Sequence, residues 1–431
     1  FLSWPAHRLR RLGQIGAGLL LLAAVGVGYL VNAIATAPLP PALADISVSR
    51  VVLDRNGDLL RAFATSDQRW RLPVRLADID PLYVRMLMAF EDRRFRDHSG
   101  VDPRALGRAA FQTITERRIV SGGSTLTMQV VRLLNEAPTR DLAAKWHQLV
   151  GALALERRLS KDEILALYLM RAPFGGNVEG VRAASLVWFG KEPRRLTPAE
   201  AALLVALPQS PESRRPDRFP DNARKARDRV LDQAVAQGVV SLEEAEAARR
   251  DPVPTQRRAM PMIAPHLTSS VVAANPARVE HRLTLDRSLQ QAMEQLVAAK
   301  ALALGPQMSA ALLVADHTSG EILASVGSPG LADDGRQGYV DMTGAVRSPG
   351  SALKPLIYGL AFEQGIAHPE SYIEDRPIRI AGYDPTNFDL SFQGTVTVRE
   401  ALQLSLNIPA VKLLEAVGPA QLTARLRRTG V

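Results

Sequence analysis

Apolar residues recur with a helical period over residues 81–91 and, with short breaks, over residues 103–171. Asp80 is a residue type that starts helices and it directly precedes Pro81, so a helix is predicted to begin there and to carry Glu91 near its carboxyl end. Three capping boxes mark further helix starts: Ser160 with Glu163, Thr197 with Glu200, and Ser241 with Glu244. The first half of the chain is therefore predicted to be mostly helical.

Two stretches have the residue pattern of strands. Residues 51–63 predict a hairpin, in which Asn56-Gly57 supplies the positive φ angles of a tight turn. Residues 310–328 predict a second hairpin that turns at Ser319-Gly320, and residues 347–365 predict a loop that leads into a helix.

The first 40 residues have the pattern of a membrane anchor. Residues 15–37 include no charged residue, and the basic stretch HRLRR (7–11) precedes them. About 20 apolar residues span a bilayer core, and a basic flank stays in the cytoplasm. We therefore expect a single-pass helix with the rest of the chain on the periplasmic side. Ala35-Thr36-Ala37 also fits the cleavage site of a signal peptide, which is the alternative.

Composition narrows the class of protein. The 431 residues are 46% hydrophobic and 23% charged, which is typical of globular rather than disordered chains. There are no cysteines, which excludes disulfides and thiolate metal sites. A formal net charge of +9 suits nucleic acid, anionic lipid or a phosphorylated substrate. Because the body is expected outside the cytoplasm, we expect no nucleic-acid partner.

Proline- and charge-rich segments divide the chain. Residues 208–220 have the composition of a domain edge, and residues 251–265 that of a linker. The predicted parts are a basic tail and anchor (1–40), a helical domain (41–215), a helical and proline-rich linker (216–305) and a mixed α/β domain (306–431).

The stretch from Glu91 to Gln129 contains the first candidate chemistry. Glu91 opens the sequence EDRRF, and a carboxylate at a helix end suits a general base, although a surface ion pair would explain it too. SGGSTLTMQ (121–129) places two glycines and several hydroxyls before a helix, an arrangement that binds phosphate through free N–H groups. The alternative for this segment is a plain capped helix start.

A second candidate site lies near the end of the chain. Ser351 precedes Lys354 by three residues at a predicted helix start, so the amine can accept the hydroxyl proton. Ser405-Leu406-Asn407 matches the S-x-N motif that accompanies S-x-x-K in penicillin-interacting serine enzymes.

These motifs together resemble a known family. EDRRF-x-x-H-x-G-V-D (91–102) and GGSTLTMQ (122–129) are similar to the first two motifs of the peptidoglycan glycosyltransferases, glycosyltransferase family 51. LERRLSKDEILALYL and APFGG…EGVRAASLVWFGK are similar to the later motifs. With S-x-x-K and S-x-N added, the chain resembles the class A penicillin-binding proteins from about residue 45 onwards.

The resemblance implies an α-rich multidomain fold. Its parts are a transmembrane helix, a lysozyme-like and mostly helical glycosyltransferase domain, a helical linker, and an incomplete α/β transpeptidase domain like the serine β-lactamases. The implied reaction polymerises lipid II into β-1,4-linked glycan at the bacterial inner membrane and releases polyprenyl pyrophosphate. The implied partners are lipid II, the growing glycan chain, the membrane and other wall-synthesis proteins. No cofactor is certain; a divalent cation, Mg²⁺ or Mn²⁺, stays open for glycosyl transfer.

The resemblance also implies residue roles. Glu91 is the base that deprotonates the acceptor's 4-hydroxyl. Ser351 is the acyl-enzyme nucleophile, Lys354 is its base, and Ser405 and Asn407 assist. The residues implied to bind the pyrophosphate or the sugars are Ser124, Thr125, Gln129, Arg132, Lys145 and Gln148.

Three positions depart from the family pattern: Gln148 stands for a second glutamate, Met170 for the asparagine of Y-L-N, and Leu133 for an asparagine. Glutamine cannot ionise, so metal binding or help to the leaving group at position 148 stays open. Two alternative functions follow. One is a lysozyme-like glycan-cleaving enzyme, against which the phosphate loop and the anchor argue. The other is an inactive lipid II-binding scaffold, which Gln148 would explain.

The third transpeptidase motif, K-T-G, does not occur before Val431. We therefore expect these 431 residues by themselves neither to cross-link peptides nor to bind β-lactam well, since a β-lactam needs the complete domain around Ser351. Incubation with a fluorescent penicillin measures this, with Ser351→Ala as the control. Stable, stoichiometric labelling of Ser351 would contradict the expectation.

Overall fold

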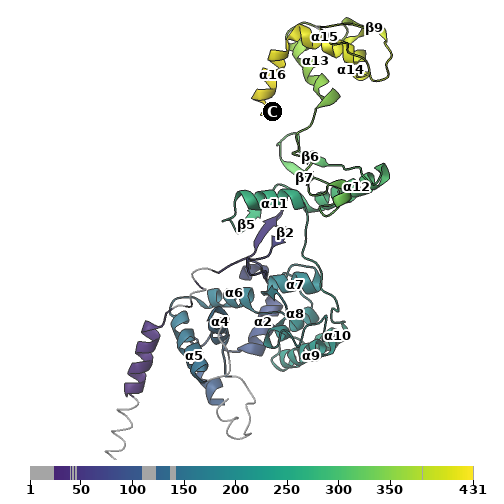
Figure 1. Ribbon diagram of the computed structural model, residues 1–431. Coiled ribbons are helices and arrows are strands. Elements are labelled where there is room, and N and C mark those ends of the chain that lie inside the picture. The colour runs from purple at the N-terminus through teal and green to yellow at the C-terminus, as the bar shows by residue number, and fades with distance from the viewer. Residues whose placement is uncertain are drawn as a thin grey trace, which may run out of the picture. The chain divides into compact units, whose positions relative to one another are not determined.

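The computed structural model describes residues 24–38, 40, 43, 46–108, 123–135, 142–380 and 382–430 (Figure 1). The chain divides into two compact units, residues 1–344 and 345–431. Most regular elements within the described ranges are helices, and the strands form only two- and three-stranded sheets. The prediction of an α-rich, multidomain protein is confirmed.

The predicted membrane anchor is the apolar run 15–37, and its first part, like the basic flank, lies in residues 1–23, outside the described residues. Residues 24–36 form a helix whose Val25, Val27 and Val31 side chains are exposed. Among the helices that the structure describes, none is both long enough and apolar enough to cross a bilayer. The anchor therefore stays a prediction.

The helical body of the first unit packs around α8 (Pro198–Ala206). Every residue of α8 from Ala199 to Ala206 except Glu200 is buried, because alanine, leucine and valine occupy all its sides. The helices that surround it or extend its layer are α2 (Pro81–Glu91), α4 (Leu126–Asn135), α5 (Leu142–Glu156), α6 (Lys161–Arg171), α7 (Val181–Phe189), α9 (Pro220–Ala236) and α10 (Leu242–Arg250). Contacts of α2 and α9 with α8 build one side of this body, and those of α4 with α5 and α6 build the other.

The predicted helix starts are confirmed. Asp80 caps α2, where one carboxylate oxygen accepts the N–H of Leu82 at 2.8 Å. The other oxygen accepts the N–H of Leu196 at 2.8 Å, so the same side chain also fixes the approach to α8. The capping boxes form as expected at Ser160 with Glu163, Thr197 with Glu200 and Ser241 with Glu244.

The first predicted hairpin is present as β1 (Arg50–Leu53) and β2 (Leu59–Phe63), which pair antiparallel. In its turn only Gly57 has a positive φ, at 90°, while the buried carboxylate of Asp54 accepts the N–H groups of Asn56 and Asp58. The predicted positive φ at Asn56 is therefore wrong, and the two hydrogen bonds to the Asp54 carboxylate stabilise the turn instead. A third strand, β5 (Glu280–Arg282), pairs parallel with β1 and was not predicted.

The second predicted hairpin is also confirmed, as β6 (Leu312–Ala315) and β7 (Ile322–Val326) with Gly320 at a φ of 74°. Helix α12 (Arg287–Leu304) packs on β7. Gln290 of α12 is fully buried and exchanges two hydrogen bonds with the backbone of Ser325, at 2.7 and 3.0 Å. The buried side chain of Gln290 therefore joins α12 to β7.

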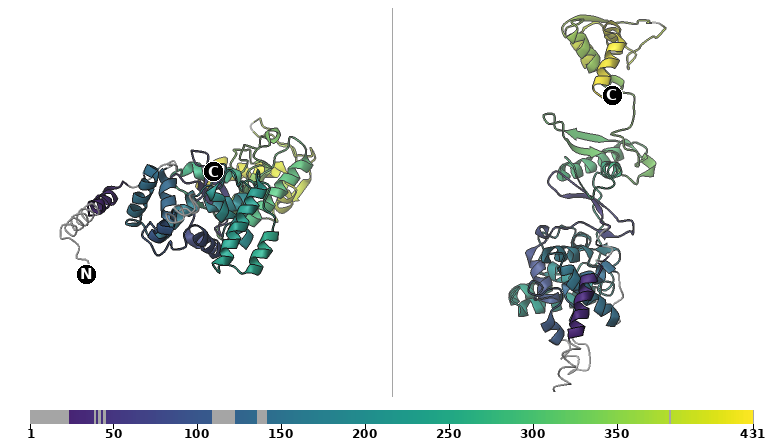
Figure 2. Two further views of the ribbon diagram at one scale, coloured as in Figure 1. Left: turned by 90° about the horizontal axis from the view of Figure 1, so that it is seen from below. Right: turned by 90° about the vertical axis from the view of Figure 1, so that its left-hand side faces the viewer.

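The second unit, drawn green to yellow in Figures 1 and 2, builds its own core. Its elements are the 3-10 helix η5 (Gly350–Leu353), α13 (Lys354–Glu363), β8 (Tyr372–Asp375), β9 (Gly394–Thr397), α14 (Val398–Gln403), α15 (Asn407–Val417) and α16 (Pro419–Arg428). Ile357, Tyr358 and Leu360 of α13 pack against Ala410 and Leu413 of α15. The predicted loop that leads into a helix is η5 followed by α13.

Because Asp80 both caps α2 and binds the Leu196 amide, we expect Asp80→Ala to destabilise the first unit by about 1–2 kcal/mol. Asp80→Asn keeps one acceptor oxygen and is expected to fall between the parent and the alanine variant. Thermal unfolding of the three proteins measures the order. Equal stability of all three would contradict the double role of this carboxylate.

Candidate active site

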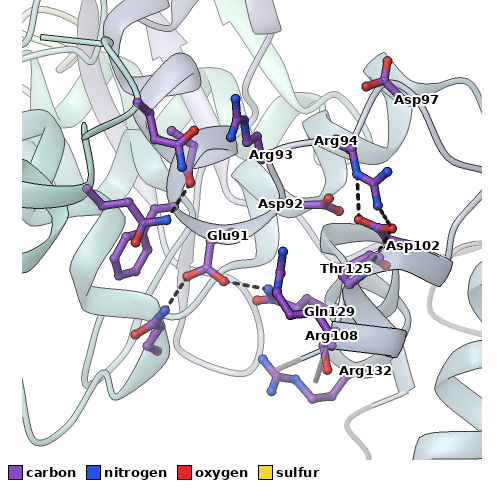
Figure 3. A pocket seen from close by; sticks show the side chains of 18 residues that line it. Glu91, Asp92, Arg93, Arg94, Asp97, Asp102, Arg108, Thr125, Gln129 and Arg132 are labelled. Carbon is purple, nitrogen blue, oxygen red and sulfur yellow. Dashed lines mark hydrogen bonds and ion pairs between the residues drawn. The ribbon is translucent and has the colours of Figure 1, made fainter. Parts of the chain in front are cut away.

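A cleft of about 940 Å³ lies beside the carboxyl end of α2 (Figure 3). Its walls come from the segment 89–108, the start of α4, the 3-10 helix η3 (Leu207–Gln209) and α9. The charged residues that line it are Glu91, Asp92, Arg93, Arg94, Asp97, Asp102, Arg108 and Arg132. The glutamines on its walls are Gln129, Gln209, Gln233 and Gln237. Such a lining suits a polar, charged ligand rather than an apolar one.

Glu91 is the last residue of α2 and projects into this cleft. One of its carboxylate oxygens accepts Nε2–H of Gln129 at 2.8 Å, and the other accepts Nε2–H of Gln209 at 2.8 Å. These donors come from α4 and η3, so three elements fix the position of the carboxylate. Both donors are uncharged amides, which orient Glu91 without pairing its charge.

Asp92 joins the two stretches that the sequence analysis singled out. It is 7% exposed, and its Oδ2 accepts the N–H of Leu126, the first residue of α4, at 3.0 Å. The same carboxylate contacts Nε2 of His98 at 3.0 Å. A negative charge at the N-terminus of a helix is stabilising. Asp92 therefore holds the start of α4 against the end of α2, next to Glu91.

Gly123 and Ser124 line the cleft just before α4, whereas residues 121 and 122 lie outside the described residues. Thr125 also lines the cleft but is 2% exposed, because its hydroxyl donates to the Gly100 carbonyl at 2.5 Å and accepts the Met128 N–H at 3.2 Å. A Cβ on Gly100 would lie 2.6 Å from the Ala152 carbonyl oxygen, so this close approach needs glycine. The Thr125 hydroxyl is thus engaged in holding the loop.

A cationic group lies behind the loop. Lys145 donates to the Ser124 hydroxyl at 2.8 Å and to Oε1 of Gln148 at 3.4 Å. Burial, and then the charge of Arg132, lower the pKa of Lys145 from its ordinary value. Gln148 is 4% exposed, and its Nε2 has no hydrogen-bond partner among the described residues. The structure therefore brings Ser124, Lys145 and Gln148 together, while Arg132 lines the cleft itself.

Arg94 and Asp102 form an ion pair across the turn that follows α2 (Figure 3). Asp102 also accepts the N–H groups of Arg104 and Ala105, at 2.9 and 3.1 Å, and so starts the helix at residues 103–108. Burial alone would raise the pKa of Asp102, but the Ala105 amide, Arg94 and the Arg104 amide together hold this pKa below its usual range. Asp102 is therefore a structural carboxylate of the cleft wall.

The carboxylates of the cleft do not make a site for Mg²⁺ or Mn²⁺. Within the described ranges, no group of three or more His, Asp or Glu residues could hold a metal ion. Glu91, Asp92 and Asp102 are already hydrogen-bonded to protein donors, and position 148 offers a neutral amide. A divalent cation of this kind takes several oxygen ligands, often carboxylates. The described donor set therefore does not fit the cation that the sequence analysis left open.

In the second unit, three of the four predicted residues meet. Nζ of Lys354 donates to the Ser405 carbonyl, to the Ser405 hydroxyl at 3.1 Å and to Oδ1 of Asn407 at 2.7 Å. Burial lowers the pKa of Lys354. Ser351 is exposed on η5, and within the described residues no hydrogen bond joins its hydroxyl to Lys354. Ser405 and Asn407 therefore hold the Lys354 amine in position, whereas the Ser351 hydroxyl is not hydrogen-bonded to it among the described residues.

A buried network that the sequence analysis missed orients Asn407. Both carboxylate oxygens of the fully buried Asp375 accept the side-chain amide of Asn387, at 3.0 and 2.9 Å. Oδ1 of Asn387 in turn accepts the N–H of Asn407 at 2.8 Å. The Asn407 amide donates to the Thr386 carbonyl at 2.7 Å, which leaves its Oδ1 to face Lys354.

The sequence analysis also missed Gln209 and Gln233. Gln209 touches Glu91 from 118 positions away, and Gln233 donates to the Ala89 carbonyl at 2.8 Å from 144 positions away. Neither lies in a local motif: the packing of α9 against α2 places Gln233, and η3, which directly follows α8, places Gln209.

Comparisons with known proteins agree with this arrangement. Residues 56–235 match the family described as Transglycosylase, and residues 310–431 match the family described as Penicillin binding protein transpeptidase domain. The chain belongs to the class A penicillin-binding proteins.

Within that class, the chain is 46% identical to penicillin-binding protein 1C of Escherichia coli over 394 residues, which cover 91% of this chain and 51% of that protein. It is 31% identical to penicillin-binding protein 1B of Vibrio cholerae over 390 residues, 84% of this chain and 49% of that protein. The chain thus spans about half the length of the curated relatives that it matches. The crystal structure of penicillin-binding protein 1A from Haemophilus influenzae matches with a TM-score of 0.38 and 18% identity, over 89% of this chain and 63% of that one.

The Asp102 contacts predict a pH-dependent stability. Because the folded pKa of Asp102 lies below its unfolded value, the ionised carboxylate stabilises the fold above the unfolded pKa of about 4, and this stability is lost as the pH falls through the folded pKa. We expect Asp102→Asn to lower Tm by several degrees at pH 7 and by much less at strongly acidic pH.

Asp97→Asn is the matched control, because Asp97 lies in the same segment and is exposed. Thermal unfolding of both variants across pH measures the difference. A Tm loss for Asp102→Asn that is independent of pH would show that the ion pair with Arg94 does not stabilise the fold.

Proposed function

We propose that this chain is a peptidoglycan glycosyltransferase that polymerises lipid II into β-1,4-linked glycan and releases polyprenyl pyrophosphate. The observation that supports this best is the position of Glu91, a carboxylate with no ion pair among the described residues, at an open polar cleft beside the start of α4. We place Glu91 as the base of the reaction. The membership of the transglycosylase family supports the same reaction class.

In this mechanism Glu91 accepts the proton of the acceptor's 4-hydroxyl, whose oxygen then attacks the anomeric carbon of the donor. The bond from that carbon to the pyrophosphate oxygen breaks, and the configuration inverts. Gln129 and Gln209 hold the carboxylate in place for the transfer.

The leaving pyrophosphate develops negative charge, which cationic and N–H donors stabilise. Arg132 on the cleft wall and Lys145 behind Ser124 supply such donors. We assign Ser124, Gln129, Arg132 and Lys145 to this binding site. Thr125 contributes through the loop that its hydroxyl holds.

The second unit supports a penicillin-binding transpeptidase role as well. Lys354, with its lowered pKa, is the base for the Ser351 hydroxyl, and Ser405 and Asn407 hold the amine. Burial favours the neutral amine, which is the form that can accept a proton. We place both units on the periplasmic side of the inner membrane, behind an anchor in residues 1–40, with domain limits at 41–215, 216–305 and 306–431.

The test of the glycosyltransferase is polymerisation of labelled lipid II by the detergent-purified chain. We expect Glu91→Gln to lower the rate by roughly a hundredfold or more, because the amide cannot accept the hydroxyl proton. Glu246→Gln, an exposed change of the same kind on α10, is the control and should leave the rate unchanged.

Other outcomes point to other functions. Release of short glycans from finished polymer, with no chain growth, would favour a glycan-cleaving enzyme. Binding of lipid II without turnover by a folded parent protein would favour the scaffold. Equal rates for the parent and Glu91→Gln would remove Glu91 from the role of base.

A further inference from the structure

Gln148 is a buried, neutral residue beside the cationic group that we assign to the pyrophosphate. Resting on the proposed function, we propose that glycosyl transfer by this chain needs no divalent cation, because Gln148 leaves the charges of Lys145 and Arg132 uncompensated. Arg132 then meets the diphosphate from the cleft wall, and Lys145 acts on it from behind Ser124. Gln148 acts through Lys145 and is a positioning residue, not a catalytic one.

The contacts of Lys145 support this role. Its Nζ lies 2.8 Å from the Ser124 hydroxyl, and Ser124 lines the cleft. Its contact with Oε1 of Gln148, at 3.4 Å, is long for a hydrogen bond. Gln148 therefore holds Lys145 loosely and leaves the ammonium directed at Ser124. Lys145 and Gln148 are one turn apart on α5, so a carboxylate at position 148 would reach the same ammonium.

Lys145 and Arg132 lie near one another and have no carboxylate partner among the described residues. Arg132 is close enough to Lys145 to lower the pKa of the lysine, and no described carboxylate forms an ion pair with either side chain. Two cations that lie near one another, with no ion pair among the described residues, repel one another and gain stability when a doubly negative diphosphate binds close to both. A carboxylate at position 148 would cancel one of the two charges.

The described carboxylates of the cleft are each held by other groups of the protein. Asp92 is engaged by His98 and the Leu126 amide, Asp102 by Arg94, and Glu91 by two glutamines. Nothing described near Lys145 offers the several anionic oxygens that Mg²⁺ or Mn²⁺ takes. Lys145 and Arg132 therefore neutralise the charge of the diphosphate, which a metal ion bound to a carboxylate would otherwise neutralise.

The first measurement is binding of inorganic pyrophosphate to the purified chain by calorimetry, in EDTA and in excess Mg²⁺. The parent is expected to bind in EDTA. Gln148→Glu is expected to bind roughly ten- to a hundredfold more weakly in EDTA, since the new carboxylate neutralises Lys145 at short range. Mg²⁺ is expected to restore most of this loss. Pyrophosphate itself binds Mg²⁺, which changes the apparent affinities of both proteins alike. The affinities are therefore compared as the ratio of variant to parent within each buffer.

Two further variants separate charge from hydrogen bonding. Gln148→Met keeps the length and neutrality of the side chain, so its affinity relative to the parent should be the same in EDTA and in Mg²⁺. Gln307→Glu adds the same charge at an exposed position after α12 and should behave as the parent. Circular dichroism shows that each variant is folded.

The second measurement is lipid II polymerisation by the parent and by Gln148→Glu in the same two buffers. Polymerisation by the parent in EDTA, with a Mg²⁺ requirement appearing in Gln148→Glu, supports the proposal. Polymerisation by the parent only with Mg²⁺ overturns it, as does unchanged pyrophosphate binding in Gln148→Glu. If the parent makes no glycan in either buffer, the proposed function fails, and the pyrophosphate ratios still decide the proposal about charge.

Discussion

The contact of the Asp92 carboxylate with the Leu126 N–H is the interaction on which the geometry of the cleft depends. It brings the end of α2 to the start of α4, and both Glu91 and Gln129 take their positions from those two helices. Burial makes this contact strong, because a carboxylate that is 7% exposed has few other partners than the helix N-terminus and His98. The two sequence motifs are thus two ends of one hydrogen-bonded junction.

Local chemistry explains which features the sequence could predict. Asp80, the capping boxes and the hairpin glycines act within a few residues of one another, so their patterns were sufficient. β5 has only three residues, and its pairing with β1 joins segments far apart in the chain, so no local pattern indicated it. The same reason hid Gln209 and the Asp375–Asn387 pair, which act on residues of the candidate sites through tertiary packing alone. Thr125 was recognised, but its burial against Gly100 was not visible in the motif.

The two candidate sites share one physical device, although their chemistry differs. In each, a charged group that would exchange a proton is oriented by side-chain amides, and the described residues form no ion pair with it. Glu91 is held by Gln129 and Gln209, and Lys354 by Asn407 together with Ser405. An amide fixes direction while leaving the charge of its partner unbalanced, which keeps that partner reactive. The supporting residues are placed by further buried contacts, as Asp375 and Asn387 show.

The two glutamines around Glu91 also simplify the interpretation of kinetic data. A carboxamide neither gains nor loses a proton under conditions in which a protein stays folded, so the two glutamines themselves introduce no pH dependence. Among the described residues, no group hydrogen-bonded to this carboxylate can ionise, so a bend in the dependence of rate on acidity cannot come from such a group. Under the proposed mechanism the bend comes from a reacting group, from the substrate or from a more distant cation, and these can be told apart by changing the substrate and the salt concentration.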